Sequence, residues 1–235
     1  CALRRWQGAS GTPRTLFQRM LAPQLLPPIV LARHVLPRTV LQLATAPLAR
    51  HRAWAEAEKD GYTVEGALLT HGHFDHCNAV EELLTKRNVP IYVNPKELEY
   101  LDKGAPRGLF LDLPMDHVKP VKSGDKLTLG NTSIAFLHTP GHTPGSQCFL
   151  VNEQLLSGDT LFLGSCGRCD LPGSSPNDLF DSLNRVIGQL PPTTVLYPGH
   201  NYSAKGTRGT LADEKKNNRF LNAHRLENFL HLVGY

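Results

Sequence analysis

The stretch LLTHGHFDHCNAV, residues 68–80, constrains the possible folds of this chain more than any other. It ends an apolar run and then places four ligand-type side chains within six positions: His71, His73, Asp75 and His76. Neutral imidazole and carboxylate are ligands of Zn²⁺ and of non-heme iron. Side chains alternate in an extended loop, so His71 and His73 can face one ion while Asp75 and His76 turn toward a second. The stretch therefore predicts a metal site at the end of a strand.

Three later loops carry further ligand-type residues, each after a predicted strand. His142 follows a strand expected at 132–138, Asp159 follows one at 154–157, and His200 follows one at 194–197. Loops at strand ends are where a rigid sheet holds side chains at fixed distances. The carboxylate of Asp159 has two oxygens and could bridge two ions. Together the four loops predict a centre with two metal ions.

The apolar periodicities after residue 55 predict an α/β fold, because strand-like and helix-like stretches alternate with short turns. We expect strands at 64–70, 91–93, 126–129, 132–138, 147–151, 154–157 and 194–197. We expect helices at 53–60, 76–87, 95–101, 179–189 and 213–232, and a loop at 104–118. Asn217 and Asn218 should break the last helix only loosely.

The first 55 residues differ in composition from the rest of the chain. They contain eight arginines and no lysine, aspartate or glutamate, so they carry +8, and the remaining residues sum to 4 − 8 = −4. We therefore divide the chain into an Arg-rich, acid-free N-terminal segment at 1–55 and a domain at 56–235. Such an N-terminus is typical of an organellar transit peptide. Disorder, a structured extension at 29–43 and an atypical gene product are the alternatives.

Charge and hydropathy also limit the classes of partner that we expect. A nucleic-acid-binding face would be expected on the folded domain, but that part is mildly acidic, so we expect no nucleic-acid partner. No apolar stretch approaches the roughly 20 residues of a membrane span, so we expect no membrane partner. Five cysteines without disulfide-framework spacing favour a reducing compartment. The expected location is intracellular, in the cytoplasm, or in a mitochondrion or plastid if the segment 1–55 is a transit peptide.

Four motifs in order, THGHFDH, TPGHTPGS, SGDTLF and YPGHNY, resemble the successive metal motifs of the metallo-β-lactamase superfamily. Within that superfamily the chain is most similar to the glyoxalase II-like branch, which holds hydroxyacylglutathione hydrolases and persulfide dioxygenases. The resemblance implies an α/β fold, an αββα sandwich. It implies that one metal is held by His71, His73 and His142, and the other by Asp75, His76 and His200, with Asp159 shared.

The resemblance also implies roles for residues around the metals. Asp75 would take a proton from the attacking water or orient it. Arg168, in SCGRCDLPG, falls where this branch places a basic residue near the substrate. Apart from the resemblance, we expect Tyr202 to pack within the domain, or else to donate a hydrogen bond to the substrate near the metals.

Two departures from the family pattern set further expectations. The family opens with several strands and an Asp-Pro-Gly-like turn, which residues 1–63 lack. Either residues 29–43 replace those strands or the first sheet is incomplete. The chain ends 35 residues after His200, which favours a shorter single-domain relative over one with additional glutathione-binding helices.

Three functions compete on these grounds. The first is a hydrolase with two zinc ions that acts on a thioester or related acyl ester, such as a glutathione thioester, with a metal-activated water as nucleophile. The second is a mononuclear iron dioxygenase that acts on a glutathione persulfide, using a His/His/carboxylate set open to O₂. The third is a truncated, inactive paralogue that acts as a binding protein.

Overall fold

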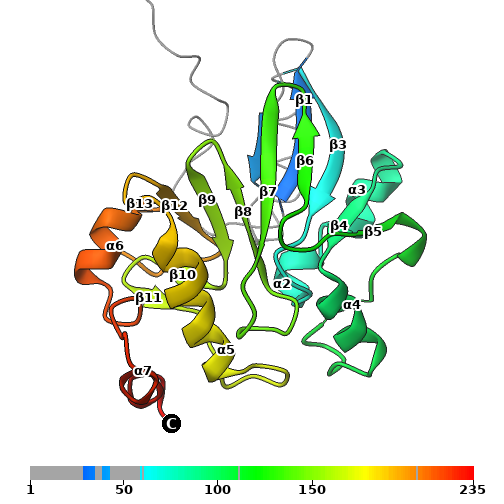
Figure 1. Ribbon diagram of the computed structural model, residues 1–235. Helices are drawn as coiled ribbons and strands as arrows, with labels where there is room; N and C mark the ends of the chain where they lie inside the picture. Colours follow the sequence, from blue (N-terminus) through cyan, green and yellow to red (C-terminus); the bar gives the residue numbers. More distant parts are fainter. Residues whose placement is uncertain (1–28, 35–38, 43–58, 60, 111, 205) are drawn as a thin grey trace, which may run out of the picture.

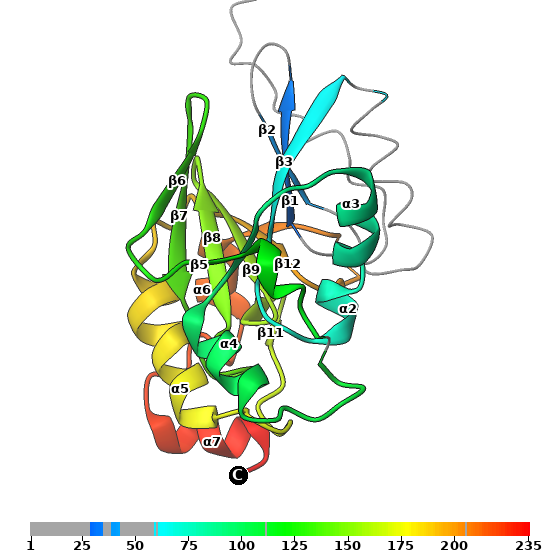
Figure 2. The ribbon, with the colours of Figure 1, turned by 90° about the vertical axis from the view of Figure 1, so that its right-hand side faces the viewer.

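Two β-sheets face each other in the computed structural model, and helices cover the outer face of each sheet (Figures 1 and 2). The structure describes residues 29–34, 39–42, 59, 61–110, 112–204 and 206–235. The helix expected at 53–60 therefore lies almost entirely outside the described residues. The αββα sandwich expected from the sequence is confirmed.

The first sheet has five strands in the order β2-β1-β3-β4-β5. These are β2 (Thr39–Gln42), β1 (Ile29–His34), β3 (Tyr62–Leu68), β4 (Ile91–Val93) and β5 (Val118–Pro120). β1 pairs antiparallel with β2 and β3, whereas β3, β4 and β5 run parallel. Two strands from within residues 29–43 thus complete this sheet, which is the first of the two alternatives raised by the missing turn.

The second sheet has six strands in the order β13-β12-β9-β8-β7-β6. These are β13 (Gly209–Thr210), β12 (Val195–Pro198), β9 (Gln154–Gly158), β8 (Gln147–Val151), β7 (Thr132–His138) and β6 (Lys126–Leu129). Only the β9–β12 pair is parallel among these neighbours. The β8–β9 hairpin turns through Asn152 and Glu153, both with positive φ, as a tight two-residue turn requires.

Three clusters of buried apolar side chains hold the layers together. Leu68 from the first sheet packs with Phe136, Phe149 and Leu156 of the second, between the two sheets. Outside the first sheet, Ile91 packs under the helices α2 (Phe74–Cys77), α3 (Val80–Lys86) and α4 (Pro95–Asp102). Outside the second sheet lie α5 (Pro176–Asp181), α6 (Leu211–Asn217) and α7 (Leu226–Val233), with the helical turns η3 (Ser182–Val186) and η4 (Ile187–Gln189) continuing α5.

Two expected helices are wrong in extent. The helix expected at 76–87 is divided into α2 and α3. The terminal helix expected at 213–232 is two helices, because Asn218 ends the first of them. The Asn218 side-chain oxygen accepts from the backbone N–H of Phe220 and of Leu221, and its amide donates to the carbonyls of Phe162 and Ser165. Only the folded chain brings those two carbonyls to Asn218, so the sequence could indicate a loose break there but not two separate helices.

Smaller elements complete the description. The turn η2 (Met115–His117) lies in the region expected to be a loop, and β10 (Leu161–Phe162) pairs with β11 (Ser165–Cys166) beyond the second sheet. The described cysteines, Cys77, Cys148, Cys166 and Cys169, are all buried and free. Among the described residues, no helix combines the length and apolar character needed to cross a membrane.

Candidate metal centre

Four loops bring the seven expected ligand residues together. The loop after β3 carries His71, His73 and the start of α2, and the loop between β7 and β8 carries His142. Asp159 directly follows β9, and His200 follows β12 closely. Because β9 and β12 are parallel neighbours, their carboxyl ends lie at the same edge of the sheet. The structure therefore collects at one place the side chains that the sequence distributes over 130 positions, from 71 to 200.

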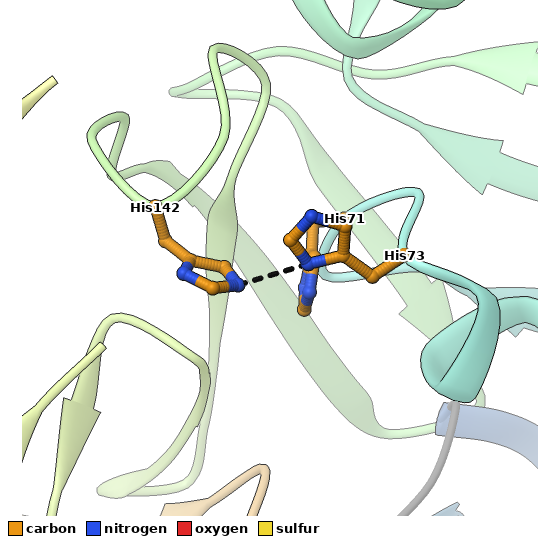
Figure 3. Close-up of side chains that lie close together, drawn as sticks. All are labelled: His71, His73 and His142. Carbon is orange, nitrogen blue, oxygen red and sulfur yellow. Dashed lines mark hydrogen bonds between the residues drawn. The ribbon is translucent and has the colours of Figure 1, made fainter. Parts of the chain in front are cut away.

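His71, His73 and His142 form the three-histidine set (Figure 3). Their exposed fractions are only 1%, 4% and 3%. Nε2 of His142 lies 3.0 Å from Nδ1 of His73, and Nε2 of His71 is buried without a hydrogen-bond partner. The three rings turn their nitrogens toward one shared space, and the ligand atoms all lie within 4.8 Å of one another.

In His142 and His71, the ring nitrogen Nδ1 contacts a neighbouring group. Nδ1 of His142 lies 2.7 Å from the carbonyl oxygen of Arg168, and Nδ1 of His71 lies 3.1 Å from the hydroxyl of Thr70. A carbonyl can only accept, so Nδ1 of His142 must carry the hydrogen. In the neutral ring, Nε2 of His142 then keeps its lone pair for a metal, and the ring orientation is fixed as well.

Asp75, His76 and His200 form the mixed set. Nε2 of His76 lies 3.1 Å from Nε2 of His200. Oδ2 of Asp75 lies 3.3 Å from Nε2 of His200 and 3.6 Å from Nε2 of His76. The Asp75 side chain is 47% exposed, whereas those of His76 and His200 are 3% and 11% exposed. This set is therefore open to solvent on the side of its carboxylate.

Asp159 lies between the two sets and contacts both. Its Oδ1 is 3.3 Å from Nε2 of His76, and its Oδ2 is 3.2 Å from Nε2 of His200 and 3.7 Å from Nε2 of His142. A Cβ at Gly199 would lie 2.4 Å from Oδ1 of Asp159, so only glycine allows the β12 loop to pass this close. This arrangement is suited to a carboxylate shared by two ions.

Burial keeps the three-histidine set uncharged. Desolvation lowers the pKa of His71 well below 6.5 and that of His73 to about 3, and neighbouring histidines lower both further. Burial also lowers the pKa of His142, against the opposing effect of Asp159. Neutral imidazole is the form that binds a metal, so this set is ready for a cation at neutral pH.

The opposite shift occurs in the mixed set. Burial lowers the pKa of His200, but hydrogen bonds to Asp159 and Asp75 outweigh it and raise that pKa to about 10. Burial raises the pKa of each aspartate, but the contacts with His76 and His200 prevail and hold both below the usual value. The positive charge of protonated His200 thus offsets the negative charges of Asp75 and Asp159. A metal cation bound at this set would offset the same charges.

The spacing of the ligand atoms fits a metal centre. Two donors bound 2.0–2.1 Å from one tetrahedral Zn²⁺ lie about 3.3 Å apart. The contacts within and between the sets run from 3.0 to 3.7 Å. Nε2 of His71 is buried without a hydrogen-bond partner, as expected of an atom that binds a metal ion. Imidazole and carboxylate donors suit zinc or iron.

Arg168 and Tyr202 lie near the centre but differ in their contacts. Arg168 is exposed, and its Nε and Nη2 bind the two carboxylate oxygens of Asp170 at 2.9 and 2.8 Å. Tyr202 is 69% exposed and stacks on the ring of His200, with ring centroids 5.5 Å apart. Phe74, next to the ligands in sequence, is also 48% exposed. Tyr202, Phe74 and Arg168 thus lie on the solvent-exposed side of the centre.

One buried carboxylate at the centre is absent from the expectations. Glu97 in α4 is completely buried and accepts hydrogen bonds from Gly72, Thr143 and Gly145, which flank three of the histidines. Its sequence position gives a misleading signal, because Glu97 falls at the third position after the N-cap Asn94. That spacing is typical of a capping box, in which the glutamate would bind its own helix end.

The comparisons with known proteins agree with this geometry. The profile of the metallo-beta-lactamase superfamily matches residues 44–200. A probable polyketide biosynthesis zinc-dependent hydrolase of Bacillus subtilis (strain 168) is 33% identical over 167 residues, which cover 71% of this chain and 69% of that protein. Two solved structures are similar in fold. ETHE1 from Myxococcus xanthus has a TM-score of 0.66 and 25% identity, covering 83% of this chain and 84% of that one.

The second structure is TTHA1623 in a di-iron-bound form, with a TM-score of 0.65 and 35% identity, covering 82% of this chain and 93% of that one. The fold, the extent of the profile match and the identity to these relatives all lead to one assignment. This chain belongs to the metallo-β-lactamase superfamily.

Proposed function

We propose that this chain is a glyoxalase II-like metallo-hydrolase that cleaves a thioester or related acyl ester with two zinc ions. One observation carries the proposal: the three-histidine set and the mixed set share Asp159, whose two oxygens reach toward both. A zinc-dependent hydrolase among the relatives supports the choice of metal. Two zinc ions at this centre would lower the pKa of a water molecule and offset charge on the acyl oxygen.

The chain's own residues then have separate tasks. The three-histidine set and the mixed set would hold the ions, and Asp159 would fix their spacing. Asp75 is half exposed, and its pKa is held below the usual value against the effect of burial by the hydrogen bond from His200. It is therefore a carboxylate at neutral pH that can orient water or accept its proton at Oδ2.

No activated cysteine competes for the role of nucleophile among the described residues. Burial raises the pKa of Cys77 well above 9.0, that of Cys148 to about 11 and that of Cys166 to about 12. A thiol with so high a pKa is protonated at neutral pH and is a poor nucleophile. Water is the nucleophile that this centre favours.

Arg168 and Tyr202 suggest how a small acyl substrate would be held. The exposed ring of Tyr202, stacked on His200, offers a surface beside the ligands, and Arg168 offers a cation for an anionic tail. That tail would compete with Asp170 for the guanidinium. A glutathione thioester has such a tail and is the first substrate to try.

Metal content and turnover, measured on the same purified protein, test the proposal. Elemental analysis should give about two zinc ions per chain, and the loaded chain should hydrolyse S-lactoylglutathione. Removing the metal with a chelator should abolish turnover, and adding zinc back should restore it. A chain that binds two zinc ions and hydrolyses none of a panel of thioesters and acyl esters would refute the acyl-hydrolase assignment.

Iron-dependent oxygenation of a persulfide is the second candidate. This candidate uses one iron ion, and the di-iron-bound form of TTHA1623, at 35% identity, supports iron as a metal for this fold but with two ions. His71, His73, His142 and Asp159 contain the two imidazoles and the carboxylate that a non-heme iron site needs. O₂ uptake by the iron-loaded chain with glutathione persulfide, without thioester hydrolysis by the zinc-loaded chain, would favour this function over the first.

A further inference from the structure

The buried carboxylate of Glu97 joins the two loops that supply the three-histidine set. Its Oε1 accepts from the backbone N–H of Gly72 at 2.6 Å, between His71 and His73 in sequence. Its Oε2 accepts from the backbone N–H of Gly145 at 2.9 Å and from the hydroxyl of Thr143 at 2.7 Å, next to His142. One carboxylate thus bridges two loops that lie about 70 positions apart in the chain.

The surroundings of Glu97 leave little freedom for this link. A Cβ at Gly145 would lie 2.2 Å from the backbone nitrogen of Glu97, so glycine lets the His142 loop rest directly on the first turn of α4. A Cβ at Gly72 would lie 3.0 Å from Oε1 of Glu97. All three groups around the carboxylate are donors, so it is fully satisfied only as an acceptor at both oxygens.

We infer that Glu97 is a positioning residue that sets the spacing of His73 and His142 by tying their loops to the same helix. The inference rests on the proposed metal function for its consequence, but the link itself is a property of the metal-free chain. Groups that hold metal ligands in place typically change metal affinity by about 10- to 100-fold when removed. Glu97 acts through the loop backbones, since it touches no ligand side chain itself.

Glu97→Gln tests the link with almost no change in shape. The glutamine has one acceptor oxygen and one NH₂ group, so in either orientation its NH₂ faces a backbone N–H, that of Gly72 or that of Gly145. One of the two backbone hydrogen bonds is lost, while a side chain of the same size still occupies position 97. Glu99→Gln is the matched control, because Glu99 lies on the same helix, is exposed and pairs only with Lys96 and Lys103 in the described structure.

The first measurement is made without metal, by NMR on the backbone amides of Gly72 and Gly145. In the unchanged chain both should be protected from hydrogen exchange, and Glu97→Gln should lower the protection of at least one of them by about 10-fold or more. Glu99→Gln should leave both unchanged. Equal protection at both amides in Glu97→Gln would overturn the inference.

The second measurement is zinc affinity, by competition with a chelator of known affinity. Glu97→Gln should weaken zinc binding by about 10- to 100-fold, while thermal unfolding of the metal-free variant still shows one cooperative transition. Unchanged affinity in a variant that has lost amide protection would also overturn the inference. If the unchanged chain shows the two protected amides and binds no zinc, the link stands and the proposed hydrolase fails.

Thr143→Val keeps the test decisive if Glu97→Gln does not fold. It removes one donor and leaves both backbone N–H groups on the carboxylate, so the metal-free chain should keep its fold. Zinc affinity should fall by a smaller factor, about 3-fold. No loss of affinity in Thr143→Val, together with an unfolded Glu97→Gln, would show that Glu97 serves the fold alone.

Discussion

The three-histidine set and the mixed set share Asp159 and lie side by side, yet their environments differ. The three-histidine set is buried and neutral. The hydroxyl of Thr70 contacts Nδ1 of His71, and Nδ1 of His142 donates to the carbonyl of Arg168. The mixed set opens to solvent at Asp75 and holds a proton on His200. The comparison shows that one centre can combine a site prepared for a cation with a site that must first release a proton.

Burial causes this difference because it acts on different groups in the two sets. Imidazoles buried beside other imidazoles lose their charge, since neighbouring like charges and low polarity both oppose protonation. An imidazole buried between two carboxylates keeps its charge, since the ion pairs outweigh desolvation. We therefore expect the three-histidine set to fill first with metal and the mixed set to fill second.

Loss of a ligand from the buried set should have the largest effect. His73→Ala removes one of the three imidazole donors of the buried set, so turnover should fall by at least about 10³-fold. Steady-state hydrolysis and circular dichroism measure the activity and the fold. His231→Ala, on the exposed side of α7, is the control and should leave both unchanged. Undiminished turnover in His73→Ala would refute the metal mechanism.

Zinc should bind in two steps that differ in proton release. Binding to the three-histidine set alone, with free zinc at about 100 times the dissociation constant of that set, should add about 2.7 kcal/mol to the free energy of unfolding. Filling the three-histidine set should release almost no proton, whereas filling the mixed set should release about one, from His200, whose pKa is raised to about 10. Calorimetry in buffers of different ionisation enthalpy measures these protons.

His200→Ala sharpens this prediction. The variant should bind one zinc ion and lose the proton release of the second step, because the three-histidine set is intact. Equal proton release in both steps of the unchanged chain would contradict the contrast between the sets.

The metal-free chain should be most stable near pH 6.5. The three-histidine set has lowered pKa values, about 3 for His73, so the unfolded chain binds more protons below pH 6.5 and stability is lost as the pH falls from 6.5 toward 3. The raised pKa of His200 gives stability that is present below 6.5 and is lost as the pH rises toward 10. Urea unfolding across this range measures both limbs.

Zinc should remove the alkaline limb of that curve, because the proton on His200 has already left when the mixed set is filled. His200→Ala should remove it in the metal-free chain. An alkaline limb that persists in His200→Ala would assign it to another group.

Substitution of Arg168, on the solvent-exposed side of the centre, should have the smallest effect on turnover. Arg168→Ala should raise KM for an anionic thioester by about 10-fold, with kcat nearly unchanged, because the guanidinium would hold a part of the substrate remote from the reacting bond. Arg185→Ala removes an exposed arginine that pairs with Asp181 and should change neither constant. A fall in kcat without a change in KM would place Arg168 in the chemistry rather than in substrate binding.

The sequence located the strands that carry the ligand loops to within two residues at each end. The hairpin strands at 126–129 and 132–138 were expected with the bounds that the structure has, because period-two apolar patterns and short turns are local signals. The αββα sandwich followed from the motifs and their order. The division at residue 55 stays a prediction, although β1 and β2 lie before it and pair into the first sheet.

Signals that depend on distant partners were missed. The sequence indicates only a loose break at Asn217 and Asn218, because the partners that hold Asn218, Phe162 and Ser165, lie far away in sequence. Glu97 is absent from the expectations for the same reason. Its ligand-holding partners, Gly72 and Gly145, carry no side chain to signal the contact.

The sequence by itself determined which side chains could meet a metal, because residue type sets the donors and each follows a strand. Only the tertiary structure decided how those donors are charged. The histidines are chemically identical in the sequence, and their pKa values separate in opposite directions because burial and nearby carboxylates act through space. The same holds for Glu97, whose carboxylate joins two loops only because α4 packs its first turn against them both.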